Sequence, residues 1–293
     1  MKRFFSFILI LALVLVYSGC QKSGNKTTVV ATTKPVYDFT ALLCQGTDIQ
    51  VTQLVTESLS CLHDYTLQVK QMRAIESADA IVISGAGLED FLEEALQGNS
   101  SVINASKGID LLCGGDEHHH DDHDGHHHEN DPHIWLDIEN ARTMAQNICT
   151  QLQTIYPHTA NQIEANMQML TEKFDELDAY GKSQLTNLSC RDLITFHDGF
   201  AYFAAYWDLH IVHSLEEESG SEASAAELKE LISLVNTYQL PAIFTEENGS
   251  TSASYVVANE TNIPVYALSM CMSDADYFTS MRYNIDTIKE ALE

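Results

Sequence analysis

The chain has 293 residues, of which 42 are acidic and 15 are basic, so its formal net charge is −27 at pH 7. This balance argues against nucleic acid as a partner, because a phosphate backbone is bound by Lys and Arg side chains. A cation is the kind of partner that suits the sign of the charge.

The N-terminus has the features of a secretory signal. Two basic residues precede an apolar run over residues 4–17, and two small residues precede Cys20. The cysteine position resembles the processing site of bacterial lipoproteins, although Tyr17 stands where Leu is usual. We therefore expect a signal peptide over 1–19, a lipidated Cys20 and a flexible tether over 20–27.

Strand and helix patterns alternate through the first part of the mature chain. The run over residues 80–84 is almost wholly apolar, which is typical of a strand in a parallel sheet covered on both faces. The alternation predicts an N-terminal α/β lobe over residues 28–157. The expected strands are 29–33, 49–55, 80–84 and 101–104, and the expected helices are 35–44, 66–77 and 87–96.

A loop of histidines and carboxylates interrupts this lobe over residues 116–131, DEHHHDDHDGHHHEND. Imidazole is a common ligand of zinc, copper and nickel, and the carboxylates raise the local concentration of cations. We expect a low-affinity metal-binding loop; the alternatives are a polar linker or a purification tag, although a tag is usually terminal and free of aspartates. The loop histidines are His118, His119, His120, His123, His126, His127 and His128.

Two helical patterns follow the loop, over residues 139–155 and 159–185. The second would be about 40 Å long, more than one lobe needs, so we expect residues 158–186 to form a rigid helix linking two lobes. Because its centre has neither Gly nor Pro, we expect little hinge motion.

A second alternation fills residues 187–293 and predicts a C-terminal α/β lobe. The fold class is therefore α/β, with a mostly parallel sheet in each of two lobes. The expected strands are 192–196, 209–213, 242–245 and 265–268, and the expected helices are 199–207, 223–238, 251–261 and 277–292.

Three histidines outside the loop stand where a strand gives way to a turn or helix, which is where open α/β sheets bind ligands. These are His63, His133 and His197. Zinc is usually tetrahedral, so imidazoles from separate rigid elements can hold one ion between two lobes. For any single histidine, capping a helix or satisfying a buried polar group is the commoner role, and this is the role that we assign to the three remaining ones, His158, His210 and His213.

Four segments together resemble the solute-binding lipoproteins of bacterial zinc and manganese ABC transporters, the ZnuA/TroA-like group. They are HDYTLQVKQMRAIESADAIVISGAGLEDFLEE from His63, DPHIWLD around His133, FHDGFAYFAAYWDL around His197 and AIFTEENGSTSASYVVANETNIPVYAL from Ala242. The resemblance implies two lobes joined by a long helix, a metal in the interlobe cleft, and His63, His133 and His197 as its ligands.

The chain departs from this family at the fourth ligand. The family often has an aspartate shortly after the segment that matches residues 265–268, where this chain reads Ser-Met-Cys-Met-Ser before Asp274. The candidates are Asp274, Cys271, Glu246 or solvent, and we favour solvent, with Glu246 as a hydrogen-bond partner of a ligand imidazole. A nitrogen-rich site favours Zn²⁺ over Mn²⁺, which prefers oxygen ligands.

The resemblance also implies partners and a location. We expect the extracytoplasmic metal-binding component of an importer, anchored by lipid to the outer face of the bacterial cell membrane, which delivers Zn²⁺ to a permease with its ATPase. We expect a monomer and no enzyme activity. The alternatives are a manganese carrier, a surface adhesin or metal buffer, and, less favoured for want of a catalytic motif such as HExxH, a secreted zinc hydrolase. Six cysteines follow Cys20 without C-x-x-C spacing, and we predict no specific disulfide.

Overall fold

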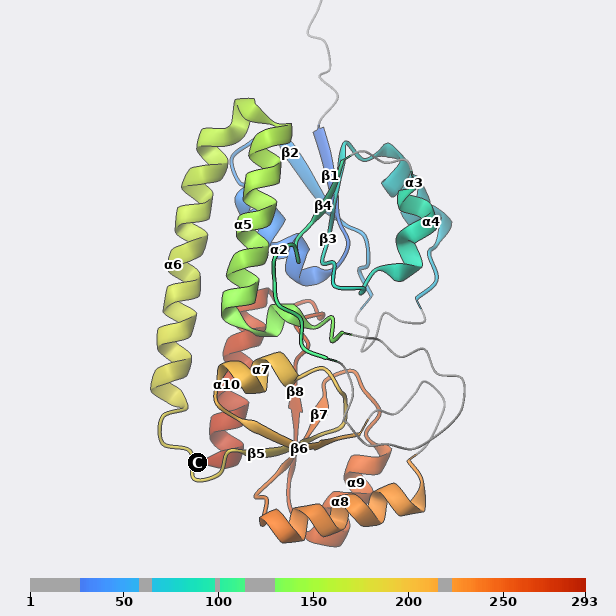
Figure 1. Cartoon of the computed structure of the whole chain (residues 1–293), viewed down its shortest axis with the longest axis vertical. Coiled ribbons are helices and arrows are strands. Elements are labelled where there is room, and N and C mark those ends of the chain that lie inside the picture. Colours follow the sequence, from blue (N-terminus) through green and yellow to red (C-terminus); the bar gives the residue numbers. More distant parts are fainter. Residues whose placement is uncertain (1–26, 58–64, 98–100, 114–129, 216–222) are drawn as a thin grey trace, which may run out of the picture.

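The computed structural model describes residues 27–57, 65–97, 101–113, 130–215 and 223–293. In these ranges two four-stranded parallel sheets lie in separate lobes (Figure 1). The strand order is β2-β1-β3-β4 in the first sheet and β6-β5-β7-β8 in the second. The strands are β1 Thr27–Ala31, β2 Ile49–Gln53, β3 Ala80–Ile83, β4 Val102–Asn104, β5 Asp192–Thr195, β6 His210–Ser214, β7 Ile243–Glu246 and β8 Val265–Leu268.

The expected α/β alternation is present in both lobes. Central strands such as β3 are buried because helices cover both faces of the sheet, which explains their continuous apolar sequence. The helices of the first lobe are α2 Lys34–Leu43, α3 Val69–Ser77 and α4 Glu93–Leu96, with the 3₁₀ turn η1 Asp90–Leu92. Those of the second lobe are α7 Ala201–Tyr206, α8 Ala225–Tyr238, α9 Ser252–Thr261 and α10 Tyr277–Leu292.

The continuous helix expected over residues 87–96 is wrong, because this segment is a turn followed by η1 and the single-turn α4. Ala86 and Gly87 have φ values of 57° and 87°, which a right-handed helix cannot include. The buried carboxylate of Glu89 accepts hydrogen bonds from the backbone of Ser84 and Gly85 at 2.6 and 2.9 Å and so fixes the turn. Glu89 thus caps the end of β3 at the place where the expected helix would have had its first turn.

Two antiparallel helices, α5 Ile138–Ile155 and α6 Ala160–Gln184, run along one side of the molecule (Figure 1). The carboxylate of Asp137 caps α5 by accepting from the backbone of Glu139 and Asn140. The turn η3 Pro157–Thr159 reverses the chain between the two helices. Figure 1 shows that α6 extends from the level of the first lobe to that of the second, as the apolar periodicity predicts.

Each end of α6 is fixed to a different lobe. The amide of Asn166 donates to the backbone carbonyls of Leu43 and Gln45, both at 2.8 Å, in the first lobe. At the other end Gly181 faces the ring of Trp207, which lies 2.1 Å from the position of a Cβ at residue 181. Only glycine permits this close approach, so the helix is packed against the second lobe as well.

The two lobes also share buried contacts near α10. The indole of Trp135, in the turn η2 Ile134–Leu136, donates to the carbonyl of Met270 at 2.8 Å. The hydroxyl of Tyr277 donates to the carbonyl of Trp135, and the backbone N–H of Tyr277 donates to Asp38. Lys34 pairs with the same Asp38 carboxylate at 2.6 Å. These bonds connect both lobes through one apolar core.

The described cysteines are free thiols, namely Cys44, Cys113, Cys149, Cys190 and Cys271. Within the described ranges no helix combines the length and the apolar character that a bilayer span requires.

Candidate metal centre

His133 is held at the end of the first lobe by the residue two positions before it. The carboxylate of Asp131 accepts from the backbone N–H of His133 at 2.9 Å and lies 2.8 Å from its Nδ1. Because a carboxylate can only accept, Nδ1 carries the proton and Nε2 is left with its lone pair. Both side chains are buried. This is the arrangement of a histidine prepared to coordinate a metal through Nε2.

The second lobe reinforces this turn. The hydroxyl of Tyr202, on α7, donates to the carbonyl of Asp131 at 3.1 Å and accepts from the backbone of Leu112 at 2.8 Å. The segments on either side of the histidine loop are thus fixed to one tyrosine of the opposite lobe. The position of His133 therefore depends on the junction of the lobes.

His197 lies in the second lobe, in the turn that follows β5. The next residue but one, Gly199, approaches the imidazole so closely that a Cβ there would lie 2.7 Å from Cδ2 and 2.8 Å from Nε2 of His197. Asp198 and Gly199 form a turn, and the hydroxyl of Ser214 donates to Asp198 at 3.1 Å. The glycine is required by the packing of the imidazole rather than by its φ angle.

The two buried histidines meet across the lobes. Their ring centroids are 5.3 Å apart and their planes are inclined by 82°. Trp135 packs edge-on against His133, with centroids 5.5 Å apart, and so supports the ring from the apolar side. Two imidazoles at this separation can direct nitrogens at a common point, which a zinc ion contacts at about 2.0 to 2.1 Å.

Glu246, at the end of β7, is 3% exposed and faces the other nitrogen of His197. Its Oε2 is 3.8 Å from Nδ1 of His197, which is beyond direct hydrogen-bond distance. Burial, with a smaller contribution from the charge of Glu247, raises the pKa of Glu246 to about 8. Glu246 thus lies on the Nδ1 side of His197, which leaves Nε2 on the opposite edge of the ring.

The other two candidates for a fourth ligand lie elsewhere. Cys271 is fully buried, and burial raises the pKa of its thiol, with Asp38 the next cause. Asp38 lies on α2, so the charge that acts on the thiol comes from the region where α2 contacts α10. Asp274 is exposed on the loop before α10. Neither residue has a described contact with His133 or His197.

The histidines assigned structural roles lie away from this pair. His158 is exposed and its Nε2 lies 3.2 Å from Asp48. His210 is exposed and its Nδ1 lies 3.0 Å from Asp192. His213 is half-buried on β6. Each takes part in the packing or surface charge of its own lobe.

The remaining predicted positions lie outside the described residues. They are His63, the lipidation site Cys20 and the loop histidines His118, His119, His120, His123, His126, His127 and His128. Among the described residues no group of three or more His, Cys, Asp and Glu side chains is arranged to hold a metal. The described part of the chain therefore contributes two imidazoles and their carboxylate partners.

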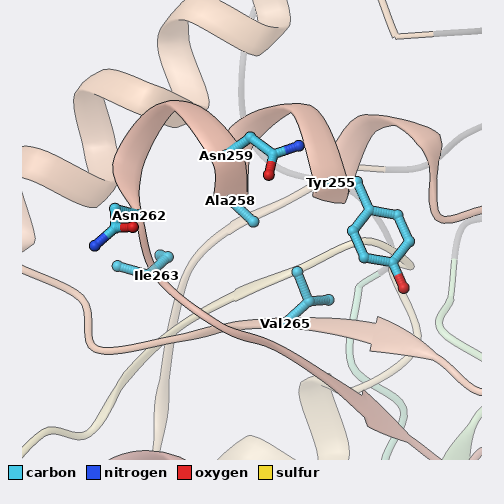
Figure 2. Close-up of a pocket in the computed structure, with 6 residues that line it drawn as sticks. All are labelled: Tyr255, Ala258, Asn259, Asn262, Ile263 and Val265. Carbon is cyan, nitrogen blue, oxygen red and sulfur yellow. The ribbon is translucent and has the colours of Figure 1, made fainter.

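A hollow of about 340 Å³ lies beside α9 and β8 in the second lobe (Figure 2). Its lining is Tyr255, Ala258, Asn259, Asn262, Ile263 and Val265. Figure 2 shows two amides and a phenol among aliphatic side chains, with neither an imidazole nor a carboxylate among the labelled residues. It lacks the donors that a transition metal prefers and is separate from the paired histidines.

Sequence reasoning did not identify two residues that shape the centre. Asp131 was named only as the last residue of the histidine loop, although a carboxylate two residues before a histidine can reach its Nδ1. Met270 gave no signal at all, because apolar residues at a strand end are common in cores. Only the tertiary structure brings it to His197.

Comparisons with known proteins agree with this architecture. A family model described as "ZnuA: Zinc-uptake complex component A periplasmic" matches residues 29–291. The manganese ABC transporter substrate-binding lipoprotein PsaA of Streptococcus mitis is 26% identical over 99% of this chain and 97% of its own length. The zinc-binding protein AdcA of Streptococcus pyogenes serotype M6 is 28% identical over 90% of this chain, which corresponds to 56% of that protein.

Solved structures show the same fold. The crystal structure of ZnuA has a TM-score of 0.79 at 27% identity and covers 92% of this chain and 100% of its own. The Zn(II)-bound ZnuA-like domain of AdcA from Streptococcus pneumoniae has a TM-score of 0.77 at 25% identity, with 92% of this chain and 99% of that domain covered.

Proposed function

We propose, from the premise that this chain belongs to the family of the periplasmic zinc-uptake complex component A, that it carries Zn²⁺ on His63, His133 and His197. It is an extracytoplasmic metal-binding component of an ABC importer, which works with a permease and an ATPase. The observation that carries the residue assignment is the pair of buried imidazoles, one from each lobe, with ring centroids 5.3 Å apart.

The chemistry of the donors supports zinc over manganese. Relatives of similar identity are named for manganese and for zinc, so family membership alone leaves both cations. In this chain the described groups that face each other are imidazoles, while Asp131 is hydrogen-bonded to His133 and Glu246 lies on the Nδ1 side of His197. Nitrogen ligands suit Zn²⁺, whereas Mn²⁺ prefers oxygen.

The carboxylates give each histidine a defined role in capture. Asp131 fixes the tautomer of His133, so that Nε2 faces outward with its lone pair. Glu246 lies at the Nδ1 side of His197 and balances the charge that the cation brings. Because each lobe supplies one of the two imidazoles, the cation would bridge the two lobes.

The test is the affinity for Zn²⁺ of the mature chain and of single alanine variants at His63, His133 and His197. We expect each to weaken tight binding by more than about 100-fold, since loss of even a partner of a ligand costs 10- to 100-fold. His158→Ala is the matched control, because that ring is exposed and pairs only with Asp48. Retention of tight binding by any of the three variants would remove that residue from the ligand set.

Selectivity needs a separate measurement. Apo protein given equimolar Zn²⁺ and Mn²⁺ is expected to retain Zn²⁺ after desalting, as measured by elemental analysis. Preferential retention of Mn²⁺ would refute the zinc assignment and leave the importer component intact as a manganese carrier.

We also propose that Cys20 anchors the protein to the outer face of the cell membrane and that it acts as a monomer. The relatives named as lipoproteins support the anchor. Mass spectrometry of the mature protein from cells should detect a diacylglycerol on Cys20, and Cys20→Ala should release the protein from the membrane fraction. A Cys20→Ala protein that stays membrane-bound would contradict this anchor.

A further inference from the structure

Met270 is fixed beside the paired histidines by its own backbone. Its carbonyl accepts from the indole of Trp135 at 2.8 Å, and the same indole packs against His133. The preceding Ser269 exchanges two hydrogen bonds with the side chain of Asn284, both at 2.7 Å. The following Cys271 has a left-handed φ of 59°, so the chain bends sharply after Met270. The residue therefore has little freedom to move away.

Its side chain ends at the imidazole of His197. The terminal methyl, Cε, lies 2.7 Å from the point that a Cβ on Gly199 would occupy, and Nε2 of His197 lies 2.8 Å from the same point. The methyl and this nitrogen are thus neighbours above Gly199. Met270 is 3% exposed, so the contact excludes water from that side of the ring.

The nitrogen beside Met270 is the one that would bind the cation. Nδ1 of His197 faces Glu246 at 3.8 Å, on the other edge of the ring. A histidine whose one nitrogen is directed at a carboxylate coordinates through the other. The thioether chain therefore borders the space in which the cation would lie, while the carboxylate of Glu246 is on the far edge.

We propose that Met270 is a specificity-determining residue, which closes one side of the cation site with a side chain that has no oxygen. This rests on the proposed function. On that side the cation would meet no oxygen ligand from the protein, which suits Zn²⁺ and denies Mn²⁺ a carboxylate oxygen of the kind that it prefers. The apolar side chain excludes oxygen ligands from that side of the cation. No bond between its sulfur and the cation is required.

Two variants at residue 270 test this role. Met270→Asp places a carboxylate on the wall, and we expect the ratio of Mn²⁺ to Zn²⁺ affinity to rise by at least about tenfold. Met270→Leu keeps the apolar bulk, and we expect that ratio to stay within about twofold of the native one. Competition against a chelator gives both affinities, and the shift of the melting temperature with each metal gives an independent readout.

The variants can fail in informative ways. If Met270→Asp does not fold as apoprotein, Met270→Asn supplies an uncharged oxygen and should change the ratio in the same direction. An unchanged ratio in the folded oxygen-bearing variant would overturn the proposal. So would a loss of Zn²⁺ affinity above about tenfold in a folded Met270→Leu, because sulfur would then be a ligand.

Zn²⁺ binding by the native protein distinguishes a failure of this proposal from a failure of the proposed function. If it binds Zn²⁺ tightly through its histidines and the folded oxygen-bearing variant leaves selectivity unchanged, only the role of Met270 fails. If it does not bind Zn²⁺, the proposed function fails first.

Discussion

Replacement of Glu246 by Gln should change the number of protons that the protein releases when it binds metal. Burial raises the pKa of this carboxyl from 4.5 to about 8. At pH 7 a group with that pKa is about 90% protonated. A cation on Nε2 of His197 favours the carboxylate form, because it places positive charge near Glu246, whose Oε2 is 3.8 Å from Nδ1 of the same ring.

The magnitude follows from these values. If Glu246 ionises when metal binds, the native protein should release about 0.9 proton more per Zn²⁺ at pH 7 than Glu246→Gln does. Titration calorimetry in buffers of different ionisation enthalpy measures this number. Near pH 9.5 the difference should vanish, because the carboxyl is by then ionised in the metal-free protein. Equal proton counts for the two proteins at pH 7 would refute the coupling.

The same carboxyl gives the metal-free protein a dependence of stability on pH. Since the folded pKa is raised, its contribution is fully present below pH 4.5 and is lost as the pH rises to about 8. The free energy of unfolding should fall across this window by at most about 1.4 kcal/mol per pH unit from this group. Denaturant titrations of Glu246→Gln should lack that part of the decline, and a decline identical in the two proteins would place the titrating group elsewhere.

Three further predictions test the centre and its surroundings. Asp131→Asn should weaken Zn²⁺ binding by about 10- to 100-fold with little effect on folding, because the amide no longer enforces protonation of His133 Nδ1; titration against a chelator measures this, and native affinity would contradict it. Gly199→Ala should destabilise the protein by about 1 to 3 kcal/mol and weaken metal binding, because the new Cβ meets His197 at 2.7 Å; unchanged unfolding and affinity would show that the turn relaxes freely. Deletion of residues 116–129, which keeps Asp131 and its contact with His133, should remove weak metal binding and leave one tight site in calorimetry, whereas loss of the tight site would show that the loop supplies a ligand.

The periodicity of apolar residues along the sequence predicted most of the fold. The apolar run of β3 and the long apolar stripe of α6 each have one physical interpretation, a strand covered on both faces and a helix longer than one lobe. The helix expected over residues 87–96 was wrong, because the spacing of apolar residues carries no information about the backbone angle φ. Ala86 and Gly87 are left-handed, and the carboxylate of Glu89 turns back to the strand end.

For the candidate centre, residue types and turn patterns indicated candidate ligands but left their surroundings open. The turn sequences around His133 and His197 indicated candidate ligands, and Glu246 was expected beside a ligand imidazole. Asp274 and Cys271 stayed open as candidate fourth ligands, because the exposure of the first and the burial of the second depend on tertiary packing.

The sequence by itself determined the α/β class and the two lobes and indicated which imidazoles are candidate ligands, because these inferences depend on local periodicity and residue type. Only the tertiary structure decided which side chains share a space, since the sheets bring together strand ends that are far apart in the chain. The contact between His133 and His197, separated by 64 positions, and the place of Met270 beside them follow from that packing.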